Sequence, residues 1–191
     1  MTGEIVSEFL IKDISEIYPG TTMDSWYFDD LVTMQSVGAV PRTDNLIADI
    51  TRAEFVHILY EYCTPSGGTG ILTFTDVSND YHFAPAIKWA MKAGIIRGIT
   101  DKTFAPDKKI ARLEMIVMLA RFDEERGNLL TATEPQHHLE DCDKIPEWGR
   151  NAAHWAIANE IIYGHKGNVL PDDYVKVKEA IAMISRLGNY S

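Results

Sequence analysis

Cysteine, long apolar runs and positive charge are all scarce in this sequence. Only Cys63 and Cys142 are present, which excludes a small fold held by several disulfides. No stretch is apolar over the length that a membrane-spanning helix needs. Acidic residues outnumber basic ones, 28 to 18, so the net charge is −10, and no basic stripe with interleaved aromatics is visible. We therefore expect a packed, acidic protein that neither binds nucleic acid nor inserts into a membrane.

The start of the chain, Met1-Thr2-Gly3-Glu4, lacks the basic and apolar regions of a secretion signal. Sequence alone therefore does not indicate export. With 191 residues, 46% of them hydrophobic, the chain can bury a sizeable core. Cys142 matches Ile14 and Val77 in a pattern that recurs along the chain, and both of these residues are apolar. A buried thiol is therefore favoured at Cys142 over a disulfide with Cys63.

What the sequence does contain is one local pattern in three copies. In each copy an apolar residue is followed four positions later by glutamate, and an amphipathic helical stretch comes next. The copies are Ile50-Thr51-Arg52-Ala53-Glu54, Ile110-Ala111-Arg112-Leu113-Glu114 and Val175-Lys176-Val177-Lys178-Glu179. Upstream, an aspartate landmark recurs at Asp13, Asp76 and Asp141. A second amphipathic stretch lies between the two landmarks, so each copy is predicted to be a helical hairpin.

The repeats are predicted at residues 9–63, 71–126 and 137–190. One such hairpin cannot cover its own apolar stripe, so the three must pack on one another. We therefore expect one structural domain built from three units.

The motifs of the second copy resemble those of the S-layer homology family. They are Phe74-Thr75-Asp76-Val77, Trp89-Ala90, Gly94-Ile95-Ile96-Arg97-Gly98, Phe104-Ala105-Pro106 and Arg112-Leu113-Glu114, and the first copy carries the family's Thr-Arg-Ala-Glu signature at residues 51–54. The resemblance covers roughly residues 9 to 190. It implies an all-α fold, with three helix-loop-helix repeats in one pseudo-threefold bundle, and a place on the bacterial cell surface, in the cell wall or S-layer.

The glutamates at the helix starts are predicted to cap them. Thr51 and Glu54 have the spacing of a capping box, in which each side chain accepts a hydrogen bond from the other residue's amide. Glu114 and Glu179 fit the same role, although Ala111 has no side-chain acceptor and Lys176 is a poor cap.

Arg52 and Arg112 are not explained by capping. An arginine in a first helical turn opposes the helix macrodipole, which favours negative charge there. Free amides at a helix start attract anions, and a guanidinium beside them can hold a carboxylate through two parallel hydrogen bonds. The pattern therefore favours a carboxylate-binding site, although the arginines could also be solvated or paired with a neighbouring acid.

The resemblance implies the ligand of that site. Modules of this family bind secondary cell-wall polysaccharides that carry pyruvate ketals, with the matching arginines facing the acid group in grooves between repeats. Only Arg52 and Arg112 inherit this role, because Val177 occupies the third position. The third groove is then either silent or uses Lys176 or Lys178, which offer charge without the guanidinium fork.

Aromatic and glycine residues are further candidates for the sugar site. Trp26 and Trp148 share one repeat position, where they could stack on sugar rings, whereas Trp89 and Trp155 are expected in the core. Gly98 and Gly164 could let backbone approach a sugar, or could simply end a helix.

Three alternatives from other classes stay open. A protein-binding module would use apolar grooves between the repeats. A polysaccharide-acting enzyme would need two carboxylates at a defined separation, which the sequence does not fix. A metal site could involve His137, His138 and Asp141, but their spacing matches no zinc pattern. We expect no cofactor, no metal and no catalysis, with acidic polysaccharide as the main partner and other surface proteins as possible partners.

Overall fold

The structure, a computed structural model, describes residues 14–40, 43–63, 70–128 and 139–189. The predicted all-α class is confirmed, since no β-strand occurs in these ranges. After a helical turn at 14–17, the elements are α2 (Phe28–Ser36), α3 (Arg52–Cys63), α4 (Ala84–Lys92), α5 (Arg112–Glu125), the 3-10 helix η1 (Cys142–Lys144), α6 (Glu147–Ala158) and α7 (Val177–Asn189).

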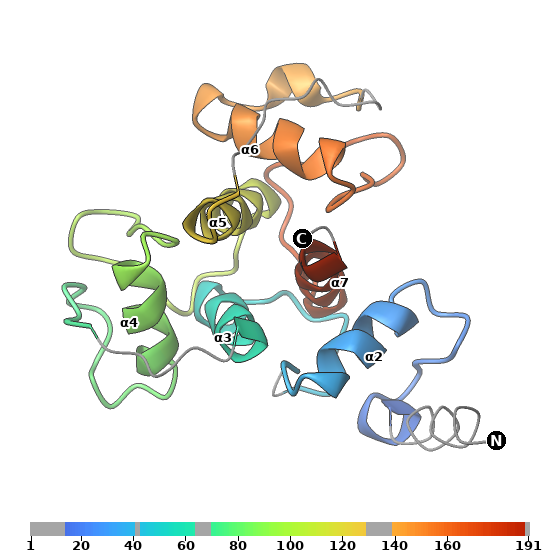
Figure 1. Ribbon diagram of the computed structural model, residues 1–191, viewed down its shortest axis with the longest axis horizontal. Helices are drawn as coiled ribbons and strands as arrows, with labels where there is room; N and C mark the ends of the chain where they lie inside the picture. Colours follow the sequence, from blue (N-terminus) through green and yellow to red (C-terminus); the bar gives the residue numbers. More distant parts are fainter. Residues whose placement is uncertain (1–13, 41–42, 64–69, 129–138, 190–191) are drawn as a thin grey trace.

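Helices α3, α5 and α7 form the centre of the molecule, and α2, α4 and α6 lie around them (Figure 1). The closest helix pairs are α3 with α4, α5 with α6, and α7 with α2. Each central helix therefore packs mainly on the outer helix of the following repeat, and the pair α7 with α2 joins the last repeat to the first. The predicted hairpin is wrong in this respect, because the two helices of one repeat are not a closely packed pair.

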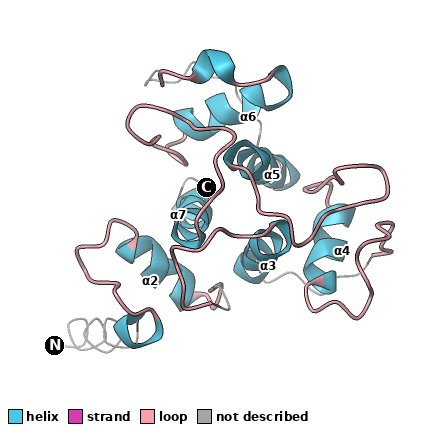
Figure 2. Ribbon diagram, turned by 180° about the vertical axis from the view of Figure 1, so that it is seen from behind, coloured by secondary structure: helices cyan, strands magenta, loops and turns pink. Residues whose placement is uncertain are grey.

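The segments that lead into the central helices meet in a closed ring of backbone hydrogen bonds. The amide of Ile50 donates to the carbonyl of Val175 (2.9 Å), Val175 donates to Ile110 (3.2 Å), and Ile110 donates to Ile50 (3.1 Å). All three side chains are fully buried. Figure 2 shows these segments converging between the central helices. The apolar residue that opens each copy of the sequence pattern is thus the one that joins the three repeats.

The predicted apolar faces of the central helices are in the core. Their buried members are Phe55, Ile58, Leu59, Met115, Met118, Leu119, Phe122, Ala180, Met183, Ile184 and Leu187. Helix α5 is buried on further sides, because Leu113, Ile116 and Ala120 are covered as well. Trp155 is also buried, and Trp89 is half-buried against the core.

In the second and third copies of the pattern, the aspartate landmark holds the loop that precedes the central helix. Asp76 accepts hydrogen bonds from the amides of Phe104 (2.9 Å) and Ala105 (2.7 Å). Asp141 does the same for Val169 (2.6 Å) and Leu170 (2.8 Å). These bonds stabilise an unfavourable backbone, because Ala105 and Leu170 have φ values of 58° and 57°.

The carboxylate of Asp141 is therefore occupied within the fold. His137 and His138, the other members of the suggested metal cluster, lie outside the described residues, as does Asp13. Within the described ranges no group of three or more His, Cys, Asp or Glu side chains could hold a metal ion. Cys63 and Cys142 are both free thiols. Residues 9, 137 and 190 also fall outside the described ranges, so the repeat boundaries stay a prediction.

Candidate functional site

The spacing that the three glutamates share corresponds to one local contact, a hydrogen bond from a backbone amide three residues earlier. Glu54 accepts from the amide of Thr51 (2.7 Å), and the Thr51 hydroxyl accepts from the amide of Glu54 (3.2 Å). Glu114 and Glu179 likewise accept from the amides of Ala111 (3.2 Å) and Lys176 (2.9 Å). All three glutamates therefore cap the helix that they begin, and only the first does so reciprocally.

The amides at the helix starts are not free, contrary to the sequence-based expectation. Arg52 and Ala53 donate to the carbonyls of Lys108 and Pro106, both at 3.0 Å. Helix α5 is bonded in the same way to Asp173 and Pro171, and α7 to Ala48 and Leu46. The loop of the following repeat thus supplies the acceptors that an anion would otherwise provide, so these first-turn amides do not form an anion site.

Arg52 is held between two repeats. Its Nε donates to the carbonyl of Phe104 (2.9 Å), one Nη donates to the carbonyl of Arg97 (3.0 Å), and the other lies 3.5 Å from a carboxylate oxygen of Glu114. The residue is only 3% exposed. Burial lowers the pKa of the guanidinium, and the charge of Glu114 opposes that shift. Arg52 therefore ties the first repeat to the loop and central helix of the second.

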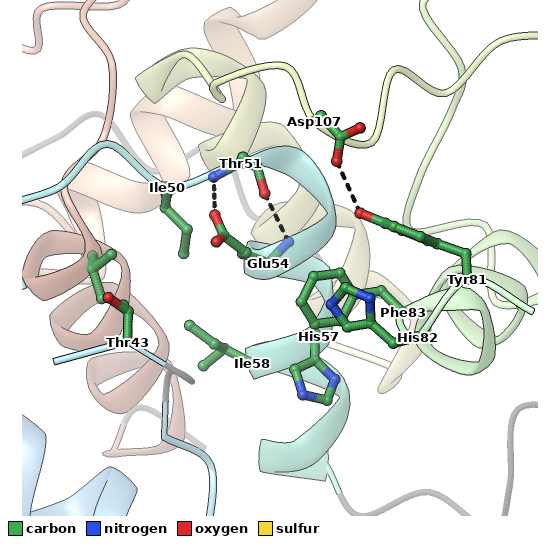
Figure 3. A pocket seen from close by; sticks show the side chains of 11 residues that line it. Thr43, Ile50, Thr51, Glu54, His57, Ile58, Tyr81, His82, Phe83 and Asp107 are labelled. Carbon is green, nitrogen blue, oxygen red and sulfur yellow. Dashed lines mark hydrogen bonds between the residues drawn. The ribbon is translucent and has the colours of Figure 1, made fainter. Parts of the chain in front are cut away.

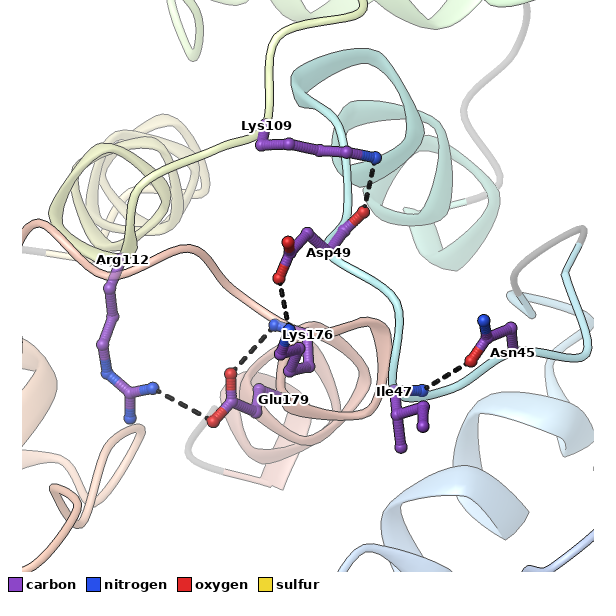
Figure 4. Close-up of polar contacts among 7 residues, drawn as sticks. All are labelled: Asn45, Ile47, Asp49, Lys109, Arg112, Lys176 and Glu179. Carbon is purple, nitrogen blue, oxygen red and sulfur yellow. Dashed lines mark hydrogen bonds and ion pairs between the residues drawn. The ribbon is translucent and has the colours of Figure 1, made fainter.

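Arg112 makes the equivalent ion pair with fewer hydrogen bonds. Its Nη1 lies 3.5 Å from Glu179 (Figure 4), but its buried Nε has no hydrogen-bond partner among the described residues. The residue is 8% exposed, and burial lowers its pKa. Both arginines therefore pair with a neighbouring acid, which was one of the alternatives that the sequence left open. Contact with a ligand also requires open space beside each guanidinium.

Each of the two arginines lines a groove of its own. The Arg52 groove has a volume of about 260 Å³ and is lined by Arg52, Arg97, Gly98, Ile99, Glu114, Val117, Met118, Arg121 and Trp148. The Arg112 groove, of about 390 Å³, is lined by Trp26, Arg112, Tyr163, Gly164, His165, Lys178, Glu179, Ala182, Met183 and Arg186. Each groove takes residues from all three predicted repeats.

These two grooves are positively charged in an otherwise acidic molecule. Three cationic side chains and one carboxylate line each groove: Arg52, Arg97 and Arg121 with Glu114, and Arg112, Lys178 and Arg186 with Glu179. Arg186 is also paired with Asp30, at 3.3 Å, which does not line the groove. Burial, and then the nearby charge of Arg97, lower the pKa of Arg121. Arg97 and Arg121 form no side-chain hydrogen bond or ion pair within the described part of the chain, so they are available to an anion.

A third groove lies beside Val177 and differs in character. The Val177 groove has a volume of about 350 Å³ (Figure 3) and is lined by Thr43, Ile50, Thr51, Glu54, His57, Ile58, Tyr81, His82, Phe83, Asp107 and Val177. None of its described lining residues is an arginine or a lysine.

Neither lysine suggested as a substitute for the missing arginine lines the Val177 groove. The Nζ of Lys176 is 2.6 Å from a carboxylate oxygen of Asp49, beside the hydrogen-bond ring (Figure 4). Lys178 lines the Arg112 groove, with its Nζ 5.4 Å from the centre of the Tyr27 ring. Lys176 precedes the first residue of α7, and Lys178 follows Val177 by one position, so neither side chain takes the place of the arginine in this groove.

Trp26 and Trp148 are exposed at the edges of the two cationic grooves, with 57% and 61% of their surface accessible. Such rings offer a flat apolar face to a sugar. Gly98 and Gly164 also line these grooves, but the loops themselves require them. A Cβ on Gly98 would lie 2.1 Å from the carbonyl oxygen of Thr100, and Gly164 has a φ of 77°.

Sequence reasoning missed several groove residues. Arg121 and Arg186 each stand seven positions after the capping glutamate, and Glu61 occupies that position in the first copy. The register that identifies Arg52 and Arg112 would also have found this pair. Arg97, by contrast, lies in a loop and has no counterpart that signals it.

Comparison with known proteins identifies the repeat. Residues 73–116 match the model of the S-layer homology domain. The matched segment contains Asp76, Gly98, Arg112 and Glu114. This chain carries an S-layer homology domain. The sequence-based recognition of the family is thereby confirmed.

Several curated proteins share sequence with a longer part of this chain. A cellulosome-anchoring protein of Acetivibrio thermocellus is 29% identical over 143 residues, which are 72% of this chain and 32% of that protein. An endoglucanase of Bacillus sp. (strain KSM-635) is 30% identical over 73% of this chain and 14% of its own length. A surface-layer 125 kDa protein of Lysinibacillus sphaericus is 27% identical over 65% of the chain. The chain thus spans at most about a third of each of these relatives.

Within the described ranges, no helix combines the length and the apolar character needed to span a bilayer.

Proposed function

We propose that this chain is a non-catalytic module that attaches a protein to the bacterial cell surface by binding an acidic secondary cell-wall polysaccharide. The acid group, a pyruvate ketal or a similar carboxylate, enters the Arg52 and Arg112 grooves. Two relatives support the location, since they are named a cellulosome-anchoring protein and a surface-layer protein.

The observation that carries the proposal is the excess of cationic side chains in these two grooves. The whole chain has a net charge of −10, yet each groove has three basic side chains and one acid. Distant surface charge is screened beyond about 8 Å at physiological salt, so the local guanidinium groups dominate the attraction. Arg97 and Arg121 bind the carboxylate directly, while Arg52 contributes charge from its fixed position.

The exposed tryptophans supply the second part of the site. Trp148 borders the Arg52 groove and Trp26 borders the Arg112 groove, so each groove pairs cations with one flat apolar face. A sugar ring stacks on the tryptophan while its acid substituent reaches the arginines.

The test is binding to purified wall polysaccharide, measured by calorimetry before and after mild acid removes the ketal. We expect Arg97→Ala/Arg121→Ala to weaken binding to the native polymer at least about tenfold, which corresponds to the loss of one charged hydrogen bond of about 1.5 kcal/mol. The same variant should bind the treated polymer no differently from the parent chain.

The matched control is Lys102→Ala/Lys144→Ala. It removes the same charge from two exposed side chains that line none of the three grooves. If this control weakens binding as much as the arginine variant, or if the treated polymer binds as tightly as the native one, the grooves are not the site.

The alternatives fit less well. A protein-binding module was expected to use apolar grooves, whereas two of the grooves are charged. The match to an endoglucanase covers 14% of that protein, so the similarity carries no inference of catalysis to this chain.

A further inference from the structure

The Val177 groove contains a carboxylate that has no basic partner among the described residues. In the other two grooves the capping glutamate has a guanidinium 3.5 Å away, from Arg52 or Arg112. At the equivalent place Val177 lines the groove beside Glu54. One carboxylate oxygen of Glu54 accepts from the amide of Thr51, and the other accepts no hydrogen bond within the described part of the chain.

A second carboxylate borders the same space. Asp107 accepts a hydrogen bond from the hydroxyl of Tyr81 at 3.0 Å (Figure 3). With Glu54 and Asp107 and no described lysine or arginine in its lining, the Val177 groove has the opposite charge to the other two. It therefore repels the acid substituent that the Arg52 and Arg112 grooves attract.

The groove also has an aromatic wall. The rings of His82 and Phe83 lie 3.7 Å apart between centroids, and those of His57 and Phe83 lie 4.8 Å apart. His82 occupies the repeat position of Trp26 and Trp148. A flat face thus stands beside the carboxylates, as it stands beside the arginines in the other grooves.

We propose that the Val177 groove binds a sugar residue that carries a free ammonium group. The ammonium takes the place of the absent guanidinium at Glu54, the sugar ring packs on the aromatic wall, and Asp107 accepts from a second donor of the sugar. This inference rests on the proposed function only in taking the ligand to be a polysaccharide. It makes the three grooves complementary to a polymer with both acidic and amino sugars.

The probe is a fully de-N-acetylated glucosamine tetramer, with its N-acetylated counterpart as the neutral comparison. We expect the amino form to bind, with amide chemical-shift changes at the Val177 groove, and the acetylated form to bind at least tenfold more weakly. Val177→Arg supplies the missing counter-ion within the chain, so it should lower affinity for the amino form at least tenfold. Ser36→Arg, an exposed position that lines none of the three grooves, adds the same charge and should change affinity less than twofold.

Glu54→Gln provides a second variant, because glutamine can still accept from the Thr51 amide while it removes the charge. Glu54→Gln should lower the affinity for the amino tetramer as Val177→Arg does. It decides the outcome if circular dichroism shows that Val177→Arg is not folded.

Equal binding of the two tetramers, or unchanged binding by the variants, would overturn the inference. So would a trilysine peptide that binds as tightly as the amino tetramer, because the groove would then recognise protein. Binding of the acidic polymer by the Arg52 and Arg112 grooves is measured separately, so failure here leaves the proposed function standing.

Discussion

Arg52 combines a structural and an electrostatic role, because the same guanidinium binds two backbone carbonyls and faces a groove. A lysine could keep the charge but could not reach both carbonyls and Glu114 together. The unfavourable place of arginine in a first helical turn is thus offset by contacts with the next repeat. The guanidinium of Arg97, in the same groove, makes no such contact with the described residues, so it can respond to a ligand alone.

The first prediction separates these roles. Arg52→Lys should lower the free energy of unfolding by about 1–3 kcal/mol, since a buried carbonyl of Phe104 or Arg97 loses its donor. Arg97→Lys should change the free energy of unfolding by less than about 0.5 kcal/mol, as expected for an exposed side chain whose guanidinium has no partner among the described residues. Urea titrations measure both. Equal stabilities of the two variants would show that Arg52 does not tie the repeats together.

Glu114 links stability to pH. Although burial raises its pKa, the hydrogen bonds from Lys108 and the Ala111 amide and the charge of Arg52 outweigh burial, so its pKa is lowered in the folded state. A carboxylate with a lowered pKa stabilises the fold above its unfolded pKa, and this contribution is lost as pH falls through the folded value.

The second prediction follows from that sign. The parent chain should lose stability between about pH 5 and pH 3, and Glu114→Gln should show a smaller loss over this range. Glu147→Gln, at an exposed position, should follow the parent curve. Urea unfolding at pH 7, 5, 4 and 3 makes the comparison, and parallel curves for parent and Glu114→Gln would contradict it.

At the ends of the outer helices, the third repeat differs from the other two in the residue that takes the left-handed backbone conformation. Gly38 and Gly94 follow α2 and α4, each with a φ of 75°. Glu160 takes the same conformation after α6, with a φ of 56°. A side chain in this left-handed region is strained, whereas glycine is not. The fold therefore imposes the turn even where the sequence does not favour it.

The third prediction is that Glu160→Gly stabilises the chain by about 1 kcal/mol, because it relieves this strain. Glu160→Gln keeps a Cβ and should give no gain. Thermal unfolding of the three chains provides the measurement, and a melting temperature for Glu160→Gly at or below that of Glu160→Gln would show that the turn carries no strain.

The sequence predicted the helices and their buried faces better than the groups to which each helix is hydrogen-bonded. Apolar spacing identifies the buried faces of the central helices, since burial leaves a chemical signature in side chains. The carbonyls of Pro106 and Lys108 leave no such signature, so their bonds to the first amides of α3 could not be predicted. For the same reason the arginines were recognised as unusual, but their hydrogen bonds to loop backbone were not.

At the scale of the whole molecule, every repeat depends on the other two. The ring through Ile50, Ile110 and Val175 needs all three segments, and each central helix packs on an outer helix of a different repeat. Each groove likewise takes residues from all three predicted repeats. Folding and ligand binding should therefore be lost together when one repeat is removed.

The fourth prediction tests this dependence. A fragment of residues 70–189 should lack a cooperative thermal transition, because α4 loses α3, α7 loses α2, and the ring loses Ile50. The full chain should unfold in one transition seen equally by circular dichroism and tryptophan fluorescence. A cooperative melt of the fragment with a helical spectrum would refute the mutual dependence.

The closed ring also limits how such a module can be enlarged by gene duplication. In an open array, each new unit stacks on an exposed end, so copies can be added indefinitely. Here the main-chain donors and acceptors of Ile50, Ile110 and Val175 satisfy one another, and no vacant end is left at the junction. A fourth tandem copy would find nothing to join there, so growth would have to proceed by whole triplets.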